Sequence, residues 1–415
     1  MTERWARTSV GSGARRLHNC DRPSSIAILR SALAARLRRR ASAAVLAVLA
    51  VLSSLLSGCG LSSSSGGRFY VVGSKIVAPN GSIYFPVGAN LATPDTLQAS
   101  DNALGRVKDV QGWGWNTVRL VTMCTKDGAS WSYGAKNGID KRTDPKTPDL
   151  HEMLAQLIKQ YTSKHIVVDV SCFDTKYGDD NFSAVMPELN SFWTYMGHTY
   201  KNNEYVWFNP LNEGFWEQPA SQFVSWYSDM YKRIRDTGAQ NLILVDPENT
   251  AEDAGWGNLP QIPDPSVGPK IAGGRCNVVF AMHNYGGLSD SDGNNYTDMS
   301  VYKDYWQKVQ KAGLAMLVEE FGYTVQNPQP DNMAGTNATL TVARQMGIGG
   351  LWWAGIANDS FSLKADGGIF DAGAPGQALN SNLSQAGQAV WNYSHNAPNL
   401  GKFHGSLKAS HCSGA

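Results

Sequence analysis

The chain has 415 residues, with 36 basic and 35 acidic side chains and a formal net charge of +1. Residues 1–58 hold ten arginines and only two acidic residues, so residues 59–415 carry a net charge of −7. An acidic body of this kind excludes the basic surface typical of nucleic-acid binding, and we expect no nucleic-acid partner. Its length suits one large domain.

The first 58 residues have the pattern of an export signal. An arginine-rich region precedes the small apolar run 41–56, which leads into Leu56-Ser57-Gly58-Cys59. This order is typical of a cleaved secretory signal rather than a membrane-spanning helix. The four residues Leu56-Ser57-Gly58-Cys59 resemble the bacterial lipoprotein box. This resemblance implies that Cys59 is lipidated and anchors the protein in a membrane, on the cell surface or in the periplasm. Plain secretion is the alternative. Residues 59–67 would form a Ser/Gly-rich tether.

Residues 68–395 alternate between short apolar runs and helix-like segments, and 396–415 form a polar tail. Asn80-Gly81, between the apolar runs 69–72 and 82–87, predicts a β-hairpin. Strands are predicted at 87–90, 117–121, 166–170, 206–208, 242–245, 278–282, 315–318 and 350–353. Helical spacing predicts helices at 101–110, 150–161, 186–200, 221–236, 301–312 and 384–393.

Eight β-branched runs alternating with helices indicate a parallel sheet covered on both faces. Eight units suit a closed (β/α)₈ TIM barrel with an N-terminal β-hairpin. An open doubly wound sheet is the alternative, but no Gly-x-Gly-x-x-Gly follows any predicted strand. In a barrel the active site lies at the carboxyl ends of the strands. Polar side chains do follow these strands, at Asn90, Arg119, Asn212, Glu213, His283, Tyr285 and Glu320.

Two apolar runs each lead into glutamate. Residues 205–211 precede Asn212-Glu213, and residues 314–318 precede Glu319-Glu320. A carboxyl group that leaves a hydrophobic strand beside aromatic residues is partly desolvated, which raises its pKa toward general-acid duty. Two carboxyl groups that face one cleft are the minimal requirement for glycoside hydrolysis.

The segments 115–119, 212–213, 282–286, 320–322 and 352–353 together resemble glycoside hydrolase family 5, a family of retaining (β/α)₈ β-glycanases. The resemblance implies that Glu213 is the general acid/base and that Glu320 is the nucleophile. Glu319 would point the opposite way, because neighbouring side chains alternate along a strand, and would be a structural or supporting carboxylate.

The resemblance also implies substrate-binding roles for several residues. Arg119 would keep the nucleophile ionised, and Asn212 would bind the sugar 2-hydroxyl. His283 and Tyr285 are two residues apart, so both would enter the site: Tyr285 would contact the nucleophile, and His283 the sugar or a carboxylate. Aromatic platforms would come from Trp353 rather than Trp352, and from Trp216 and Trp256.

One feature departs from the family pattern. Many relatives carry a histidine after the third strand, where this chain offers only Ser171 or Asp174 as substitutes. Four cysteines follow Cys59, with three possible pairings and no zinc-binding spacing. Cys124 and Cys172 follow neighbouring strands, so a bridge there is plausible and would leave Cys276–Cys412.

The segments 174–178 and 244–249 look like those of bacterial β-mannanases. We therefore expect endo-acting, retaining hydrolysis of β-1,4 bonds in a hexose polysaccharide, with mannan as the first choice. The alternatives are a cellulase and, from another class, a non-catalytic carbohydrate-binding barrel on the cell surface. No metal or other cofactor is expected, and the protein is expected to be a monomer.

Overall fold

The computed structural model describes residues 67–93, 103, 105–125, 150–174, 182–214, 220–246, 275–285, 298–322, 330–353, 363 and 380–404. All of them belong to the unit Ser65–Ala415. The predicted signal segment and Cys59 lie outside the described residues and stay predictions. Within the described ranges, no helix combines the length and apolar character needed to cross a lipid bilayer.

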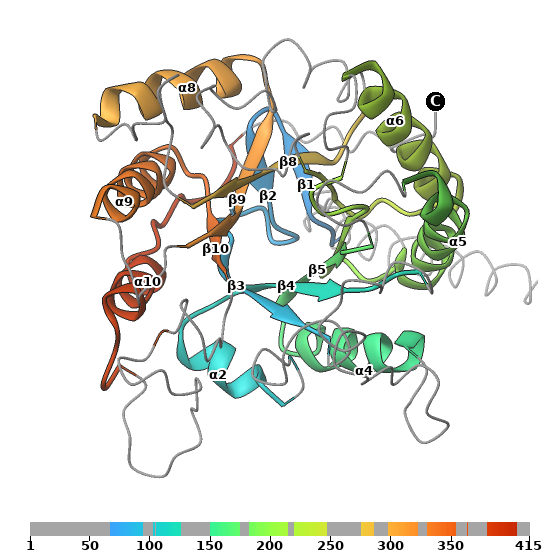
Figure 1. Cartoon of the computed structure of the whole chain (residues 1–415), viewed down its shortest axis with the longest axis horizontal. Coiled ribbons are helices and arrows are strands. Elements are labelled where there is room, and N and C mark those ends of the chain that lie inside the picture. The colour runs from blue at the N-terminus through green and yellow to red at the C-terminus, as the bar shows by residue number, and fades with distance from the viewer. Residues whose placement is uncertain are drawn as a thin grey trace, which may run out of the picture. The chain divides into compact units, whose positions relative to one another are not determined.

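Eight parallel strands form a closed barrel, in the order β10-β3-β4-β5-β6-β7-β8-β9. They are β3 (Val87–Ala92), β4 (Thr117–Thr122), β5 (Val167–Cys172), β6 (Val206–Asn209), β7 (Ile243–Val245), β8 (Val278–Asn284), β9 (Ala315–Phe321) and β10 (Gly350–Trp352). Every residue in them is buried, as expected for strands covered on both faces. The predicted (β/α)₈ TIM barrel is confirmed (Figure 1).

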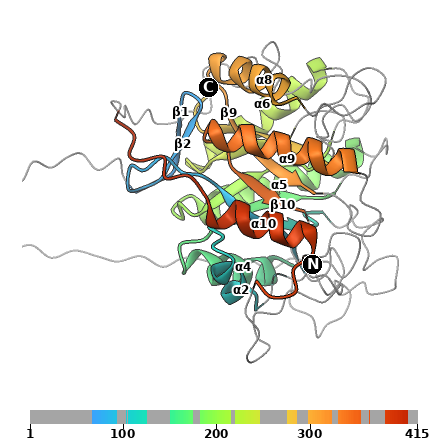
Figure 2. The same ribbon diagram turned by 90° about the vertical axis from the view of Figure 1, so that its left-hand side faces the viewer.

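Helices surround the strands (Figure 1). They are α2 (Val107–Gly112), α4 (Leu150–Thr162), α5 (Phe182–Tyr200), α6 (Ala220–Asp236), α8 (Met299–Lys311), α9 (Pro330–Gln345) and α10 (Gln385–His395). Figure 2 shows α8, α9 and α10 side by side along one flank. Helix α9 was not among the predicted helices, because its sequence is rich in Thr, Asn and Gly, which are weak helix formers.

The N-terminal hairpin exists, but its turn lies earlier than predicted. Strands β1 (Tyr70–Val72) and β2 (Lys75–Val77) pair antiparallel around Gly73, whose φ of 55° suits a tight turn. The predicted Asn80-Gly81 turn connects β2 only to an isolated bridge between Val77 and Ile83. Phe69, just before β1, packs edge-to-face on Trp207 of β6, with ring centroids 5.4 Å apart. The hairpin thus covers the amino-terminal end of the barrel, opposite the predicted site.

Candidate active site

Buried charged side chains collect inside the barrel near the carboxyl ends of its strands. Asn90, Arg119 and Asp169 are register partners on the neighbouring strands β3, β4 and β5, so all three project to one face. Arg119, Asp169, His283 and Glu319 have no exposed surface, and Glu320 has only 2%. Buried charges of this kind require partners, because desolvation is unfavourable for an isolated ion.

Arg119 bonds to residues from several strands. Its Nη1 atom donates to Glu320 Oε1 and, over 3.1 Å, to Asn90 Oδ1. Its Nη2 atom donates to Asn212 Oδ1 over 2.6 Å and lies 3.1 Å from Glu319 Oε2 and 3.3 Å from Asp246 Oδ2. Burial alone would lower the pKa of Arg119, but the facing carboxylates raise it, so the guanidinium stays charged.

A β-bulge in β9 brings two consecutive carboxylates into the barrel. Met282 pairs with Val318, but the next residue, His283, pairs with Glu320, so β9 has one extra residue there. The pairing with β10 shifts at the same place. The expectation that Glu319 points away from Glu320 is therefore wrong: the bulge breaks the alternation, and both bind Arg119.

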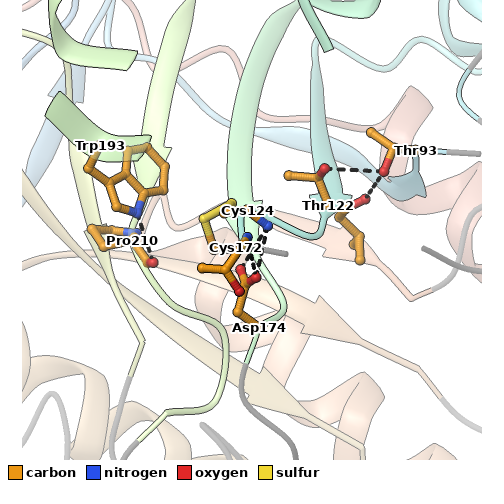
Figure 3. The surroundings of a disulfide bond; sticks show 9 residues. Thr93, Thr122, Cys124, Cys172, Asp174, Trp193 and Pro210 are labelled. Carbon is orange, nitrogen blue, oxygen red and sulfur yellow. Dashed lines mark hydrogen bonds between the residues drawn. A yellow bond between two sulfur atoms is a disulfide. The ribbon is translucent and has the colours of Figure 1, made fainter. Parts of the chain in front are cut away.

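Glu213 lies on a firmly held loop beyond β6, which ends at Asn209, one residue past the predicted strand 206–208. Trp193 Nε1 of α5 donates to the Pro210 carbonyl over 3.0 Å, as Figure 3 also shows. The Asn212 amide donates to the Cys172 carbonyl over 2.8 Å, and the Glu213 amide donates to Asp246 Oδ2 over 3.2 Å. Glu213 itself has a φ of 44°, a strained value for a residue with a side chain.

Glu213 and Glu320 meet at one nitrogen of His283. Nδ1 of His283 lies 2.7 Å from Glu213 Oε1 and 3.3 Å from Glu320 Oε2. One oxygen of each carboxyl lies within 4.8 Å of the other. Burial raises the pKa of Glu213, and the bond to His283 opposes part of that rise. The two predicted catalytic glutamates therefore face one another inside a single site.

Glu320 is oriented through both oxygens. Arg119 donates to Oε1, and the Tyr285 hydroxyl donates to Oε2 over 2.5 Å. A carboxylate that accepts hydrogen bonds from a cation and a phenol through its two oxygens is held in one orientation. Tyr285 directly follows β8, and His283, two residues earlier, enters the same site, as the sequence spacing predicted.

Three further residues that contact the site, Asn209, Asp246 and Asp169, were not predicted as site residues from the sequence. Asn209 Nδ2 donates to Asp246 Oδ1 over 2.6 Å and to both oxygens of Glu319 over 2.9 Å. Asp169 lies close to Glu319, and burial raises the pKa values of both Asp169 and Asp246 well above the ordinary range. Two features of the sequence could have indicated these residues: Asp169 is an acidic residue inside an apolar run, and Asn209 precedes a proline at the end of β6.

Residues 91–359 match the family described as Cellulase (glycosyl hydrolase family 5). The chain belongs to glycosyl hydrolase family 5. A mannan endo-1,4-beta-mannosidase from Cellvibrio japonicus (strain Ueda107) is 25% identical over 299 residues, which is 72% of this chain and 61% of that protein. A beta-mannanase/endoglucanase A from Caldicellulosiruptor saccharolyticus is 24% identical over 276 residues, 66% of this chain and 18% of that protein. This chain thus spans less than two thirds of both relatives.

The barrel of this family 5 member also resembles solved structures. The catalytic domain of a mannanase from Streptomyces sp. SirexAA-E aligns with a TM-score of 0.59 and 21% identity, covering 82% of this chain and 96% of that domain. At this level of identity the likeness supports the fold, while the site rests on the contacts described above.

A disulfide braces the rim of the family 5 site. Cys124 and Cys172, which follow and end the neighbouring strands β4 and β5, are bonded, as predicted (Figure 3). Asp174 accepts hydrogen bonds from the Cys124 and Thr125 amides over 2.9 and 2.6 Å, so it anchors the rim beyond β4. Cys276 is disulfide-bonded as well, and the expected pairing with Cys412 lies outside the described residues.

The two tryptophans at β10 have different environments. Trp352 is fully buried and packs edge-to-face on Phe321, at 5.6 Å between centroids. Trp353 is half-buried and stacks on Phe173, at 5.9 Å and an interplanar angle of 10°. Trp353 is thus the residue that can offer a surface to a sugar. Trp216 and Trp256 lie outside the described residues.

Within the described part of the family 5 chain, three groups bring metal-ligand atoms within 4.8 Å of one another. One is the disulfide with Asp174, and the second is Glu213, His283 and Glu320. The third is Asp246, His283 and Glu319, where Arg119 lies only 3.1 Å from Glu319. A bound cation would have to displace this ion pair or the hydrogen bonds of the facing glutamates.

Proposed function

We propose that this protein hydrolyses internal β-1,4 bonds of a hexose polysaccharide, mannan in the first place, with retention of anomeric configuration. The separation of Glu213 and Glu320 carries the proposal, because one oxygen of each lies within 4.8 Å of the other. Retaining glycosidases hold their two carboxyl groups about 5–5.5 Å apart, whereas inverting enzymes need about 6.5–9.5 Å to admit a water molecule.

In the first step Glu320 attacks the anomeric carbon. The bond between this carbon and the glycosidic oxygen breaks, and Glu213 gives its proton to the departing oxygen. Arg119 and Tyr285 hold the attacking carboxylate in place through its two oxygens. The products are a shortened chain with a free hydroxyl and a sugar joined to Glu320 through an ester.

In the second step Glu213, now a carboxylate, takes a proton from water. The water oxygen bonds to the anomeric carbon, and the ester bond to Glu320 breaks. Two displacements restore the original configuration, and each glutamate returns to its starting protonation state. Glu213 therefore needs a pKa that allows it to lose and regain a proton during each turnover.

Substrate contacts follow from the same geometry. Arginine only donates hydrogen bonds, so the Asn212 oxygen faces Arg119, and the Asn212 amide nitrogen is the group proposed to bind the sugar 2-hydroxyl. Trp353 supplies an aromatic face for a pyranose ring. The names of both relatives include a mannan-cleaving activity, which favours mannan, and one name also includes an endoglucanase, which keeps cellulose as the alternative.

The test is release of reducing ends from mannan, cellulose and xylan. Mannan should be cleaved fastest, and Glu320→Ala should lose on the order of 10⁵-fold in rate while keeping the wild-type fold by circular dichroism. Glu213→Ala should lose about 10²–10⁴-fold on mannan but far less on an aryl glycoside whose leaving group needs no proton. Binding without cleavage by the wild type would favour the non-catalytic alternative.

We further propose that the protein is exported and tethered through a lipidated Cys59. The arginine-rich segment, the apolar run and Leu56-Ser57-Gly58-Cys59 support this proposal. The Cys124–Cys172 disulfide suits an oxidising compartment. Cells fed labelled fatty acid should incorporate the label into the full chain, and the protein should be found in the membrane fraction. Cys59→Ser should abolish both the labelling and the membrane location. Labelling that persists in this variant would contradict the proposal.

A further inference from the structure

His283 lies between four carboxyl groups. Its Nδ1 atom is 2.7 Å from Glu213 and 3.3 Å from Glu320. Its Nε2 atom is 3.6 Å from Glu319 and 3.8 Å from Asp246, and the ring is fully buried. At these distances the interactions at Nε2 are charge–charge contacts rather than hydrogen bonds.

The other charged or titratable groups around the ring come from neighbouring strands. Arg119 of β4 binds both carboxylates of β9, Tyr285 bonds to Glu320, and Asp169 of β5 lies beside Glu319. Burial alone would lower the pKa of His283, but Glu320 in the first place, and then Glu213 and Glu319, raise it well above the ordinary value. The surroundings therefore favour an imidazolium.

Of the two carboxyl groups at Nε2, Glu319 is the ionised one. It faces Arg119 at 3.1 Å and accepts from Asn209 at 2.9 Å through both oxygens. Burial alone would raise the pKa of Glu319, but Arg119 and His283 lower it. Asp246 lies at a similar distance from the ring, 3.3 Å from Arg119, and accepts from Asn209 over 2.6 Å, yet burial and the charge of Glu319 raise its pKa. Asp246 thus contributes less negative charge at Nε2.

We propose that Glu319 is a positioning residue: its carboxylate keeps His283 protonated on both nitrogens, and the cationic His283 sets how readily Glu213 releases its proton. This inference rests on the hydrolysis proposed above. Glu319 can act in this way only because the bulge in β9 turns it into the barrel beside Glu320.

The effect on Glu213 has a definite sign. A cation within 4–6 Å lowers the pKa of a carboxyl group by about 1–3 units, and His283 is in direct contact with Glu213. Glu319→Gln has two opposing effects on the pKa of Glu213: it removes a negative charge, which lowers this pKa, and it lets His283 lose its proton, which raises it. His283 is nearer to Glu213 than Glu319 is, so the loss of the His283 proton dominates. The pKa of Glu213 then rises, and the enzyme keeps its acid protonated to higher pH.

The kinetic test compares Glu319→Gln with Asp246→Asn, because both residues face the same atom at nearly the same distance. In Glu319→Gln the alkaline limb of kcat/KM on mannan should move up by at least about one pH unit. In Asp246→Asn, which removes little charge, it should stay within about a third of a unit. An unmoved limb in Glu319→Gln, or an equal shift in both variants, would overturn the inference.

A second test does not depend on turnover. Nitrogen-15 NMR of the wild type, labelled on histidine, should show both ring nitrogens of His283 protonated at pH 7, with His283→Gln identifying the signal. A neutral His283 in the wild type would overturn the inference whatever the protein hydrolyses. A cationic His283 in a protein that cleaves none of the polysaccharides would instead refute the proposed function.

Discussion

Glu319 and Glu320 are consecutive in the chain, yet both carboxylates are buried inside the barrel and bind one guanidinium group, that of Arg119. Two carboxyl groups therefore share one guanidinium group that has no exposed surface. The arrangement leaves each carboxylate a second set of partners: Asn209 for Glu319 and Tyr285 for Glu320. One glutamate is thereby committed to the interior, and the other is presented toward substrate.

Arg119→Lys should impair both stability and catalysis. A lysine cannot reproduce the two-nitrogen contacts to Glu320, Asn90 and Asn212. We expect a loss of about 3–5 kcal/mol in unfolding free energy, because buried carboxylates lose their partner, and a fall in kcat of at least about a hundredfold. Denaturant unfolding and initial rates measure the two effects.

Arg235→Lys is the matched control for this prediction. Arg235 is also buried, but its guanidinium donates to backbone carbonyls such as that of Ala239, remote from the glutamates. This variant should lose stability while its kcat per folded molecule stays near the wild-type value. A comparable loss of kcat in both variants would contradict a specific role for Arg119.

Asp169→Asn should stabilise the protein increasingly as the pH rises. Burial raises the pKa of Asp169, and neither of its oxygens accepts a hydrogen bond from a donor among the described residues. The folded state therefore holds the Asp169 proton more tightly than the unfolded state does. The stability that protonated Asp169 contributes is complete below the unfolded-state pKa and is lost as the pH rises toward the folded-state pKa. Asparagine mimics the neutral acid without ionising.

Urea unfolding between pH 4 and pH 9 measures this effect. The stability difference between Asp169→Asn and the wild type should grow by about 1.4 kcal/mol per pH unit until the folded-state pKa is reached. Asp298→Asn is the control: the Ser300 amide lowers the pKa of Asp298, so the stability difference from the wild type should stay constant above about pH 4 and shrink only in more acidic solution. A pH-independent difference for Asp169→Asn would show that this carboxyl is ionised in the folded protein.

Replacing the two tryptophans of β10 should separate binding from folding. Trp353→Ala should reduce kcat/KM on polysaccharide about tenfold, equivalent to about 1.4 kcal/mol, and Trp353→Phe should recover part of the loss. Trp352→Ala should instead destabilise the fold by about 3–5 kcal/mol, because it empties a buried site beside Phe321. The reverse pattern would assign the sugar platform to Trp352.

Removal of the Cys124–Cys172 bridge should lower stability more than activity. The bridge links residues with a sequence separation of 48, which corresponds to about 4 kcal/mol of chain entropy in the unfolded state. Asp174 would still hold the Cys124 and Thr125 amides, so the Cys124→Ala/Cys172→Ala variant should keep most of its activity well below its lowered melting temperature. Complete inactivity in a folded variant would contradict this division of roles.

Glu213→Gly should be more stable than Glu213→Ala, although both should be poor catalysts. At a φ of 44° glycine is unstrained, whereas alanine retains a penalty of about 1 kcal/mol. Thermal unfolding of the two variants measures the difference. The order should reverse at Gln388, an exposed position in the regular helix α10, where alanine is preferred over glycine. Equal stabilities at position 213 would argue against backbone strain there.

Much of the barrel and of its site could be predicted from the sequence. Apolar runs gave the strands and most helices, and the polar residues that follow them, Arg119, Glu213, His283 and Glu320, do converge. The inward turn of Glu319 could not be predicted, because a bulge depends on how β9 pairs with β8 and β10 rather than on its own residues. The hairpin was misplaced because Gly73 competes with Asn80-Gly81 for the turn.

The extra residue in β9 also bears on how this part of the chain can change over evolution. Deleting one residue there would restore regular alternation but send either Glu319 or Glu320 to the outer face of the barrel, toward the helices. Inserting one would move Phe321 from its place against Trp352. A change in the length of this segment would therefore separate the two carboxylates, so homologous barrels that share this carboxylate pair should align across β9 without gaps.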